Sequence, residues 1–272
     1  MHNPSKHYKV CLSVAGSDPS GGAGIQADLK TFSALGCYSA TAITAITIQN
    51  TTGVARSVPL PAETVREQMA AVMSDLHPDA LKIGMTANAD IIHAIAQTIR
   101  EYPVGFIVLD PIMVSSSGHR LLDPPATAAL VGELMPLCTL VTPNIPELEA
   151  LTGTKDAVCG ARRLLSQTAG QYVLVKGGHL EGQPTDILVS DKHAVSFDGI
   201  RVATRNTHGT GCTLSSAIAA QMAIQPDRSL DSAVGDAKRY VEAALLAGAD
   251  VSIGEGHGPM NHFFNPRPTL IE

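Results

Sequence analysis

A glycine-rich stretch in the last third of the chain has the composition of an anion-binding loop. Residues 207–212 read Thr-His-Gly-Thr-Gly-Cys and precede a run rich in alanine and serine that favours a helix. Two glycines let a backbone approach a ligand closely, and the first turn of a helix presents unpaired N–H groups and a positive dipole end. A phosphate whose charge moves during reaction fits such a loop. A tight turn into a core helix explains the two glycines equally well.

Charged and amide side chains follow several apolar, strand-like runs. Asp110 and Lys176 each come directly after such a run, and Asn144 and Glu147 lie three apart where a helix begins. Ligands of parallel α/β sheets bind outside the carboxyl ends of the strands, so we expect these side chains to share one edge. A cation with two carboxylates suits metal-dependent phosphoryl transfer. A simple helix cap accounts for Asn144 and Glu147 as well.

The first third of the chain offers side chains that could hold a ring. Gln49 ends an alternating β-branched run, where its carboxamide presents a donor beside an acceptor, although a turn-capping amide is an equal alternative. Met85 follows a short buried run and either fills the core or lines a pocket. Asp28 lies in the first turns of a helix beyond the glycine loop that starts at Gly16, where a solvated carboxylate is the ordinary outcome.

The elements that must position these residues alternate between strands and helices. The predicted strands cover residues 8–15, 39–48, 80–85, 104–109, 139–142 and 172–175, followed by a hairpin of 187–190 and 194–197. The predicted helices cover residues 23–35, 61–76, 88–102, a start at 144–147, the run from the glycine loop to 223, and 229–247. No linker separates two cores and no repeat is visible. We therefore predict one α/β domain over residues 1–272, with a mainly parallel central sheet flanked by helices.

Composition favours a small-molecule protein. The chain has 272 residues, of which 44% are hydrophobic and 16% charged, and its formal net charge is −6. This balance argues against a nucleic-acid or anionic-membrane partner. Neither a signal peptide nor a membrane span is visible, so we expect a cytoplasmic protein. The five cysteines form no Cys-x-x-Cys or Cys/His cluster, so neither a disulfide framework nor zinc is indicated.

Three kinds of function compete at this point. Residues 22–27 fit the Gly-x-Gly-x-x-Ala fingerprint of nucleotide-dependent oxidoreductases, but the next strand ends in Gln49 and Asn50 rather than in the acid that holds a ribose. Phosphoryl transfer accounts for the carboxylates, the lysine and the late glycine loop. A protein that only binds a ligand leaves this clustering of acids, lysine and cysteine unexplained.

Seven motifs together resemble the bacterial hydroxymethylpyrimidine/phosphomethylpyrimidine kinases of thiamine biosynthesis, within the ribokinase superfamily. They cover nearly the whole chain in order: residues 15–30, 47–51, 82–85, 110–113, 142–147, 176–179 and 207–212. Some bacterial pyridoxal kinases share much of this pattern and form the nearest alternative. The resemblance implies a ribokinase-like fold, commonly a homodimer, that uses ATP and Mg²⁺. The implied substrates are an aminopyrimidine with a primary alcohol and then its monophosphate.

The resemblance also implies a role for individual residues. Gln49 would bind the aminopyrimidine edge, Asp28 and Gly16 would border the same pocket, and Met85 would pack on the ring. Asp110 and Glu147 would serve Mg²⁺. The residues implied in ATP binding are Asn144, Lys176, Thr207, Gly209, Thr210 and Gly211, of which Lys176, Gly209 and Gly211 would also act on the transferring phosphoryl group.

Cys212 stands where ribokinases usually have an aspartate that acts as general base. Its position after Gly-Thr-Gly, at a predicted helix start and near Lys176, predicts a lowered thiol pKa and a partly ionised thiolate at neutral pH. We therefore expect Cys212 to take the proton of the substrate hydroxyl. A small buried residue that packs under the loop is the simpler alternative.

Overall fold

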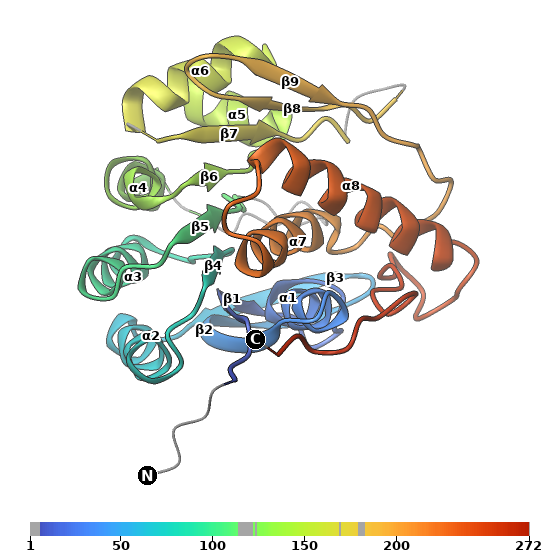
Figure 1. The fold of residues 1–272 in the computed structure, drawn as a ribbon, viewed down its shortest axis with the longest axis horizontal. Coiled ribbons are helices and arrows are strands. Elements are labelled where there is room, and N and C mark those ends of the chain that lie inside the picture. Colours follow the sequence, from blue (N-terminus) through green and yellow to red (C-terminus); the bar gives the residue numbers. More distant parts are fainter. Residues whose placement is uncertain (1–5, 114–121, 123, 169, 179–182, 272) are drawn as a thin grey trace.

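The computed structural model describes residues 6–113, 122, 124–168, 170–178 and 183–271 (Figure 1). Its centre is a nine-stranded sheet in the order β3-β2-β1-β4-β5-β6-β7-β8-β9. The strands are β1 (Val10–Ser17), β2 (Tyr38–Asn50), β3 (Gly53–Pro59), β4 (Ala80–Ile83), β5 (Phe106–Leu109), β6 (Leu140–Val141), β7 (Tyr172–Val175), β8 (Asp186–Val189) and β9 (Ala194–Phe197).

The strands from β2 to β7 run parallel, and the two ends of the sheet are antiparallel. The predicted mainly parallel sheet and the hairpin at β8 and β9 are therefore confirmed. Strand β3 was not predicted, because Gly53–Pro59 is bounded by glycine and proline, lies at the sheet edge and has no buried residue. It pairs with β2 as a second hairpin, so Gln49 lies beside a turn rather than at a free strand end.

Helices cover both faces of the sheet (Figure 1). One layer contains α2, α3, α4, α5 and α6, and the other contains α1, α7 and α8. The helices are α1 (Gly24–Ala34), α2 (Ala62–Leu76), α3 (Ala89–Glu101), α4 (Pro124–Ala129), α5 (Ile145–Thr152), α6 (Ala157–Thr168), α7 (Thr210–Ile224) and α8 (Leu230–Ala247). Two of them, α4 and α6, were not predicted. A π-helical turn (Leu130–Leu134) and a 3₁₀ turn (Met135–Leu137) follow α4.

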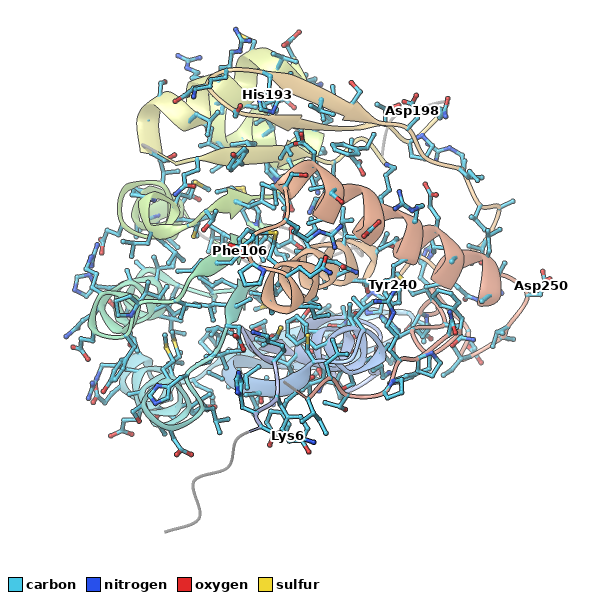
Figure 2. All side chains as sticks on the ribbon, in the orientation of Figure 1. Lys6, Phe106, His193, Asp198, Tyr240 and Asp250 are labelled. Carbon is cyan, nitrogen blue, oxygen red and sulfur yellow. The ribbon has the colours of Figure 1, made fainter. Side chains whose placement is uncertain are left out.

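Side chains alternate between two hydrophobic clusters because successive residues of a strand point to opposite faces. In β4, Leu81 and Ile83 pack with α2 and α3, whereas Ala80 packs toward α7 and α8. Figure 2 shows Phe106 and Tyr240 within this second layer, while Asp198 and Asp250 lie at the periphery. The resulting α/β/α arrangement fixes the strand ends that carry the polar residues.

Helix α7 is buried along nearly its whole length. Its small residues let it approach the sheet on one side and α1 and α8 on others. Gly209 precedes it with φ +83°, a left-handed conformation that favours glycine. The predicted glycine loop leading into a helix is thus confirmed. Among the helices that the structure describes, none is both long and apolar enough to cross a membrane.

Candidate active site

A cavity of about 550 Å³ opens at the carboxyl ends of the parallel strands. Loops after β1, β2, β4, β5, β6 and β7 surround it, together with the first turn of α7. The structure brings all but one of the predicted site residues to this cavity. They are Gly16, Gln49, Met85, Asp110, Asn144, Glu147, Lys176, Thr207, Gly209, Thr210, Gly211 and Cys212.

Glycine is required at position 209, and the backbone at Gly211 passes close to charged side chains. A Cβ at Gly209 would lie 1.8 Å from the carbonyl oxygen of Gly22, and a Cβ at Gly211 would lie 3.3 Å from Lys176 Nζ. The loop backbone therefore passes directly beside the lysine ammonium. In the first turn of α7 the Thr210 amide donates to the Thr207 carbonyl oxygen at 3.3 Å, whereas the Gly211 and Cys212 amides have no acceptor within the helix. The dipole of a 15-residue helix adds positive potential there. The arrangement suits a bound phosphate.

Lys176 lies between two carboxylates at the same place. Its Nζ is 2.5 Å from Asp110 Oδ1 and 3.9 Å from Glu147 Oε2. Burial disfavours the ammonium, but the two carboxylates outweigh it and raise the pKa of Lys176, so the cation is retained at neutral pH. Burial raises the pKa of Glu147 to about 7, with Asp110 adding to the shift and Lys176 opposing it. Glu147 is thus poised to lose a proton when a further cation approaches.

Asn144 and Glu147 cap helix α5 and face the cavity at once. Asn144 Oδ1 accepts a hydrogen bond of 2.8 Å from the Glu147 amide, and Glu147 Oε2 accepts one of 2.8 Å from the Asn144 amide. This is the reciprocal capping box that the sequence left as an alternative. The Glu147 carboxylate also receives a backbone hydrogen bond from Met113, so the cap and the loop after β5 both hold it at the cavity.

Two carboxylates with room for water and phosphate oxygens suit Mg²⁺, which takes few protein ligands. Asp110 and Glu147 both line the cavity beside the glycine loop. Within the described part of the chain, no group of three or more His, Cys, Asp or Glu side chains could hold a metal ion by itself. The residues present fit a magnesium ion that is delivered with a nucleotide and shared with its phosphates.

The prediction of a lowered pKa for Cys212 was wrong. The residue is 6% exposed, and burial raises its thiol pKa to about 11. Lys82 lowers the thiol pKa, but Asp28 and Asp110 raise it further. The helix start and the nearby cation therefore do not compensate for desolvation, and the thiol is protonated at neutral pH.

Asp28 was predicted to border the substrate pocket, and the structure corrects this. Its side chain is fully buried, and both carboxylate oxygens lie 2.8 Å from Lys82 Nζ. The hydroxyls of Ser13 and Ser216 donate to the same carboxylate at 2.6 and 2.7 Å. Burial alone would lower the pKa of Lys82, but the Asp28 charge raises it, so Lys82 keeps its charge. Asp28 joins α1, β4 and α7 beneath the cavity and is not available to a ligand.

Two residues at the Gln49 end of the cavity were not predicted as site residues. His208 Nε2 lies 2.8 Å from Asp18 Oδ2 and 3.1 Å from the Gln49 carboxamide. Burial would raise the pKa of Asp18, but hydrogen bonds from His208, Ser20 and the Ala23 amide outweigh it and lower the pKa to about 2. Both residues belong to glycine-rich loops that were recognised in the sequence, and this position in a loop is the signal by which they could have been predicted.

The opposite end of the cavity has an apolar wall. It is formed by side chains from α7, from α8 and from the segment between β9 and α7: Ile200, Val202, Leu214, Val241 and Leu245. Beside this wall, Lys238 Nζ donates to Asp186 Oδ2 at 2.7 Å, and the Gly177 amide donates to Asp186 Oδ1 at 2.9 Å. An apolar slot next to a phosphate site can accept the flat base of a nucleotide.

Comparison with known proteins agrees with this geometry. The family model described as phosphomethylpyrimidine kinase matches residues 18–261. The hydroxymethylpyrimidine/phosphomethylpyrimidine kinase of Rhizobium meliloti is 50% identical over 260 residues, covering 93% of this chain and 97% of that protein. The crystal structure of a Clostridium difficile phosphomethylpyrimidine kinase has a TM-score of 0.76 at 41% identity and covers 87% of this chain and 99% of that chain.

Pyridoxal kinases are also similar in structure. An ADP complex of the Bacillus subtilis pyridoxal kinase has a TM-score of 0.85 at 34% identity, covering 94% of this chain and 98% of that chain. The predicted ribokinase-like fold is thereby confirmed, and the oxidoreductase and binding-only alternatives are excluded by the family match. The chain belongs to the phosphomethylpyrimidine kinase family and is a kinase of thiamine biosynthesis.

Proposed function

We propose that this kinase transfers the γ-phosphoryl group of ATP to the hydroxymethyl oxygen of 4-amino-5-hydroxymethyl-2-methylpyrimidine, and then phosphorylates the resulting monophosphate. The observation that carries the proposal is one cavity that has the Gln49 carboxamide, the Lys176 cation and the glycine loop in its lining. A ring alcohol and a phosphoryl donor can therefore meet in one cavity. The names of the relatives supply the substrate class.

The pyrimidine would occupy the end of the cavity near Gln49. A carboxamide matches the amino group and the adjacent ring nitrogen of an aminopyrimidine with one donor and one acceptor. A Cβ at Gly16 would lie 3.1 Å from Met85 Sδ, so glycine at this position leaves room beside the thioether. Met85, itself buried, then offers a polarisable surface to the ring.

The nucleotide would occupy the other end. Its base would lie against the apolar wall, and its phosphates would meet Lys176, Asn144, Thr207 and residues 209–211. Backbone N–H groups and a fixed ammonium stabilise the charge on a transferring phosphoryl group without reorganising during the step. The ADP complex of the related pyridoxal kinase supports this use of an adenine nucleotide.

We assign Mg²⁺ to Asp110 and Glu147. When bound, the ion neutralises charge on the phosphates of the donor. Lys176 holds a phosphate oxygen, and the glycine loop orients the phosphoryl group toward the alcohol. Cys212 remains our candidate for the acceptor of the hydroxyl proton. Because its pKa is raised to about 11, only the small thiolate fraction present at neutral pH can accept that proton, and this fraction grows as pH rises.

Phosphorylation of pyridoxal is the second candidate, because the fold of a pyridoxal kinase superimposes well on this chain. The three substrates are separated by one assay. Purified protein is incubated with MgATP and either hydroxymethylpyrimidine, its monophosphate or pyridoxal, and ADP release is followed. We expect the highest kcat/KM with the two pyrimidines. A higher kcat/KM with pyridoxal would overturn the assignment.

We further propose a homodimer that acts in the cytoplasm, with residues 1–272 as one domain and without nucleic-acid or membrane partners. The β2–β3 hairpin carries several exposed apolar side chains, which support an interface there: Tyr38, Ile46, Ile48 and Val58. The net charge of −6 supports the absence of polyanionic partners. Light scattering of the purified protein measures its mass, and a monomer at all concentrations would contradict the dimer.

A further inference from the structure

The ionised carboxylate of Asp18 determines which proton state its histidine partner adopts. Asp18 Oδ2 accepts from the backbone amides of Gly22 at 3.1 Å and Ala23 at 2.8 Å, and it lies 2.8 Å from His208 Nε2. A carboxylate in this state has no proton to donate. His208 Nε2 therefore carries a hydrogen and donates it, whichever state the other ring nitrogen adopts.

The same Nε2–H also faces the carboxamide of Gln49, so its one hydrogen is shared between the Asp18 carboxylate and the Gln49 group in a bifurcated hydrogen bond. A rotamer with the amide nitrogen 3.1 Å from His208 Nε2 sets two donors against each other. A half-turn about the last side-chain bond removes the conflict, because oxygen and nitrogen exchange places and the oxygen then accepts from His208. The hydrogen-bond network is what assigns the two ends of such an amide.

Thr47 selects the same orientation from the other side. Its hydroxyl donates to the Ser17 carbonyl oxygen at 2.9 Å, so the single hydroxyl hydrogen is already used. The other end of the Gln49 carboxamide lies 3.2 Å from this hydroxyl oxygen. Only an amide N–H can make that contact a hydrogen bond. Both neighbours thus require the oxygen toward His208 and the nitrogen toward Thr47.

We propose that His208, held by Asp18, is a positioning residue that fixes the orientation of the Gln49 carboxamide. The orientation of the bound aminopyrimidine ring is thereby fixed as well. This inference rests on the proposed function. The free lone pair of the Gln49 oxygen accepts from the exocyclic amino group on the His208 side. The free N–H of Gln49 donates to the adjacent ring nitrogen on the Thr47 side.

The position of His208 also connects the ring-binding end to the phosphate loop. It directly precedes Gly209, and its ring lies so close to Gly22 that a Cβ there would be 2.3 Å from His208 Cδ2. The backbone amide of His208 donates to the Gly258 carbonyl oxygen at 3.1 Å. One buried side chain therefore spans the first glycine loop, the β2–β3 hairpin and the start of the anion loop.

The test compares two pyrimidine alcohols with opposite hydrogen-bond patterns. The 4-amino compound offers a donor beside an acceptor, whereas its 4-oxo analogue offers an acceptor beside a ring N–H. The measured quantity is the ratio of their kcat/KM values, with the ratio of their dissociation constants from calorimetry as a second readout. A site with a fixed amide should favour the amino compound by at least about 100-fold, because the analogue leaves two polar pairs unmatched.

Two variants of His208 separate orientation from folding. His208→Phe keeps a ring but removes the donor, so that only the 3.2 Å contact with Thr47 still orients the amide, and we expect the ratio to fall at least about tenfold. His208→Gln keeps an N–H near the position of Nε2, so the ratio should stay within about threefold of the parent. His93→Phe is the matched control, since His93 is exposed on α3 and does not line the cavity.

A parent enzyme that phosphorylates neither pyrimidine contradicts the proposed function. The ratio of the two dissociation constants still tests the orientation of the Gln49 carboxamide in that case. A His208→Phe variant that is folded and keeps the parental ratio overturns the inference, even if its activity is low. Thr47→Val provides a second probe of the same amide: it should also lower the ratio, and an unchanged ratio contradicts the assignment of the amide nitrogen to the Thr47 side.

Discussion

Replacing Asp28 by asparagine should destabilise the protein strongly while leaving substrate affinity nearly intact. The change removes the charge that compensates Lys82, whose side chain is fully buried and 2.8 Å from both Asp28 oxygens. Breaking one partner of a buried pair costs about 3–5 kcal/mol, since an unpaired charge stays in the interior. For a chain of this size each kcal/mol shifts the midpoint by about 2–4 °C, so we expect a loss of roughly 6–20 °C.

Thermal unfolding followed by circular dichroism measures this loss, and three further variants interpret it. Lys82→Met alone should be similarly harmful, whereas Asp28→Asn with Lys82→Met should recover most of the midpoint, because no charge remains buried. Glu63→Gln is the control, since it breaks an exposed pair with Arg66 and should not move the midpoint measurably. An Asp28→Asn protein that melts like the parent but has a raised KM for the pyrimidine would refute this reasoning. Asp28 would then be assigned to substrate binding.

Three further predictions concern the cavity. Gln49→Leu should lower kcat/KM for the pyrimidine at least about tenfold in steady-state assays, because it leaves a polar pair unmatched, and equal loss of ATP affinity would contradict the assignment. Asp110→Asn or Glu147→Gln should raise the Mg²⁺ concentration needed for half-maximal rate. In the parent enzyme the Mg²⁺ concentration needed for half-maximal rate should fall as pH rises through about 7, because the pKa of Glu147 is raised and only its ionised form binds a cation. A Mg²⁺ requirement that stays constant in titrations from pH 6 to about 8 would contradict the assignment of Glu147 to the metal. Cys212→Ala should lower kcat about 100-fold. The variant should also lack the rise of kcat with pH that a thiol with a pKa of about 11 gives the parent. A loss below about threefold with an unchanged pH profile would show that Cys212 is not the base.

The residues found from the sequence share a local signal. Asp110 and Lys176 follow buried apolar strands, and the glycine loop precedes a helix-favouring run. A parallel sheet brings the carboxyl ends of its strands to one edge, so local position was enough to gather these groups around one cavity. The capping box at Asn144 and Glu147 was predictable for the same reason, because its partners lie three residues apart.

The features that could not be predicted from the sequence depend on contacts between distant segments. Lys82 pairs with Asp28 across 54 residues, and His208 meets Asp18 across 190 residues, so no spacing rule relates either pair. The error over Cys212 has the same origin. A helix start and a nearby lysine can be read from the sequence, but the burial that dominates its pKa is set by how α7 packs against the sheet.

A protonated thiol at Cys212 changes which groups must supply the catalysis. In a loose transition state the attacking oxygen forms little bond before the phosphoryl group leaves its donor, so an early base contributes little. What must be ready in advance is positive potential along the path of the phosphoryl group. Lys176, held between Asp110 and Glu147, and the N–H groups of the glycine loop are fixed before any ligand arrives. Because preorganised donors of this kind act without reorganising during the step, we expect electrostatic positioning to outweigh proton removal in this cavity.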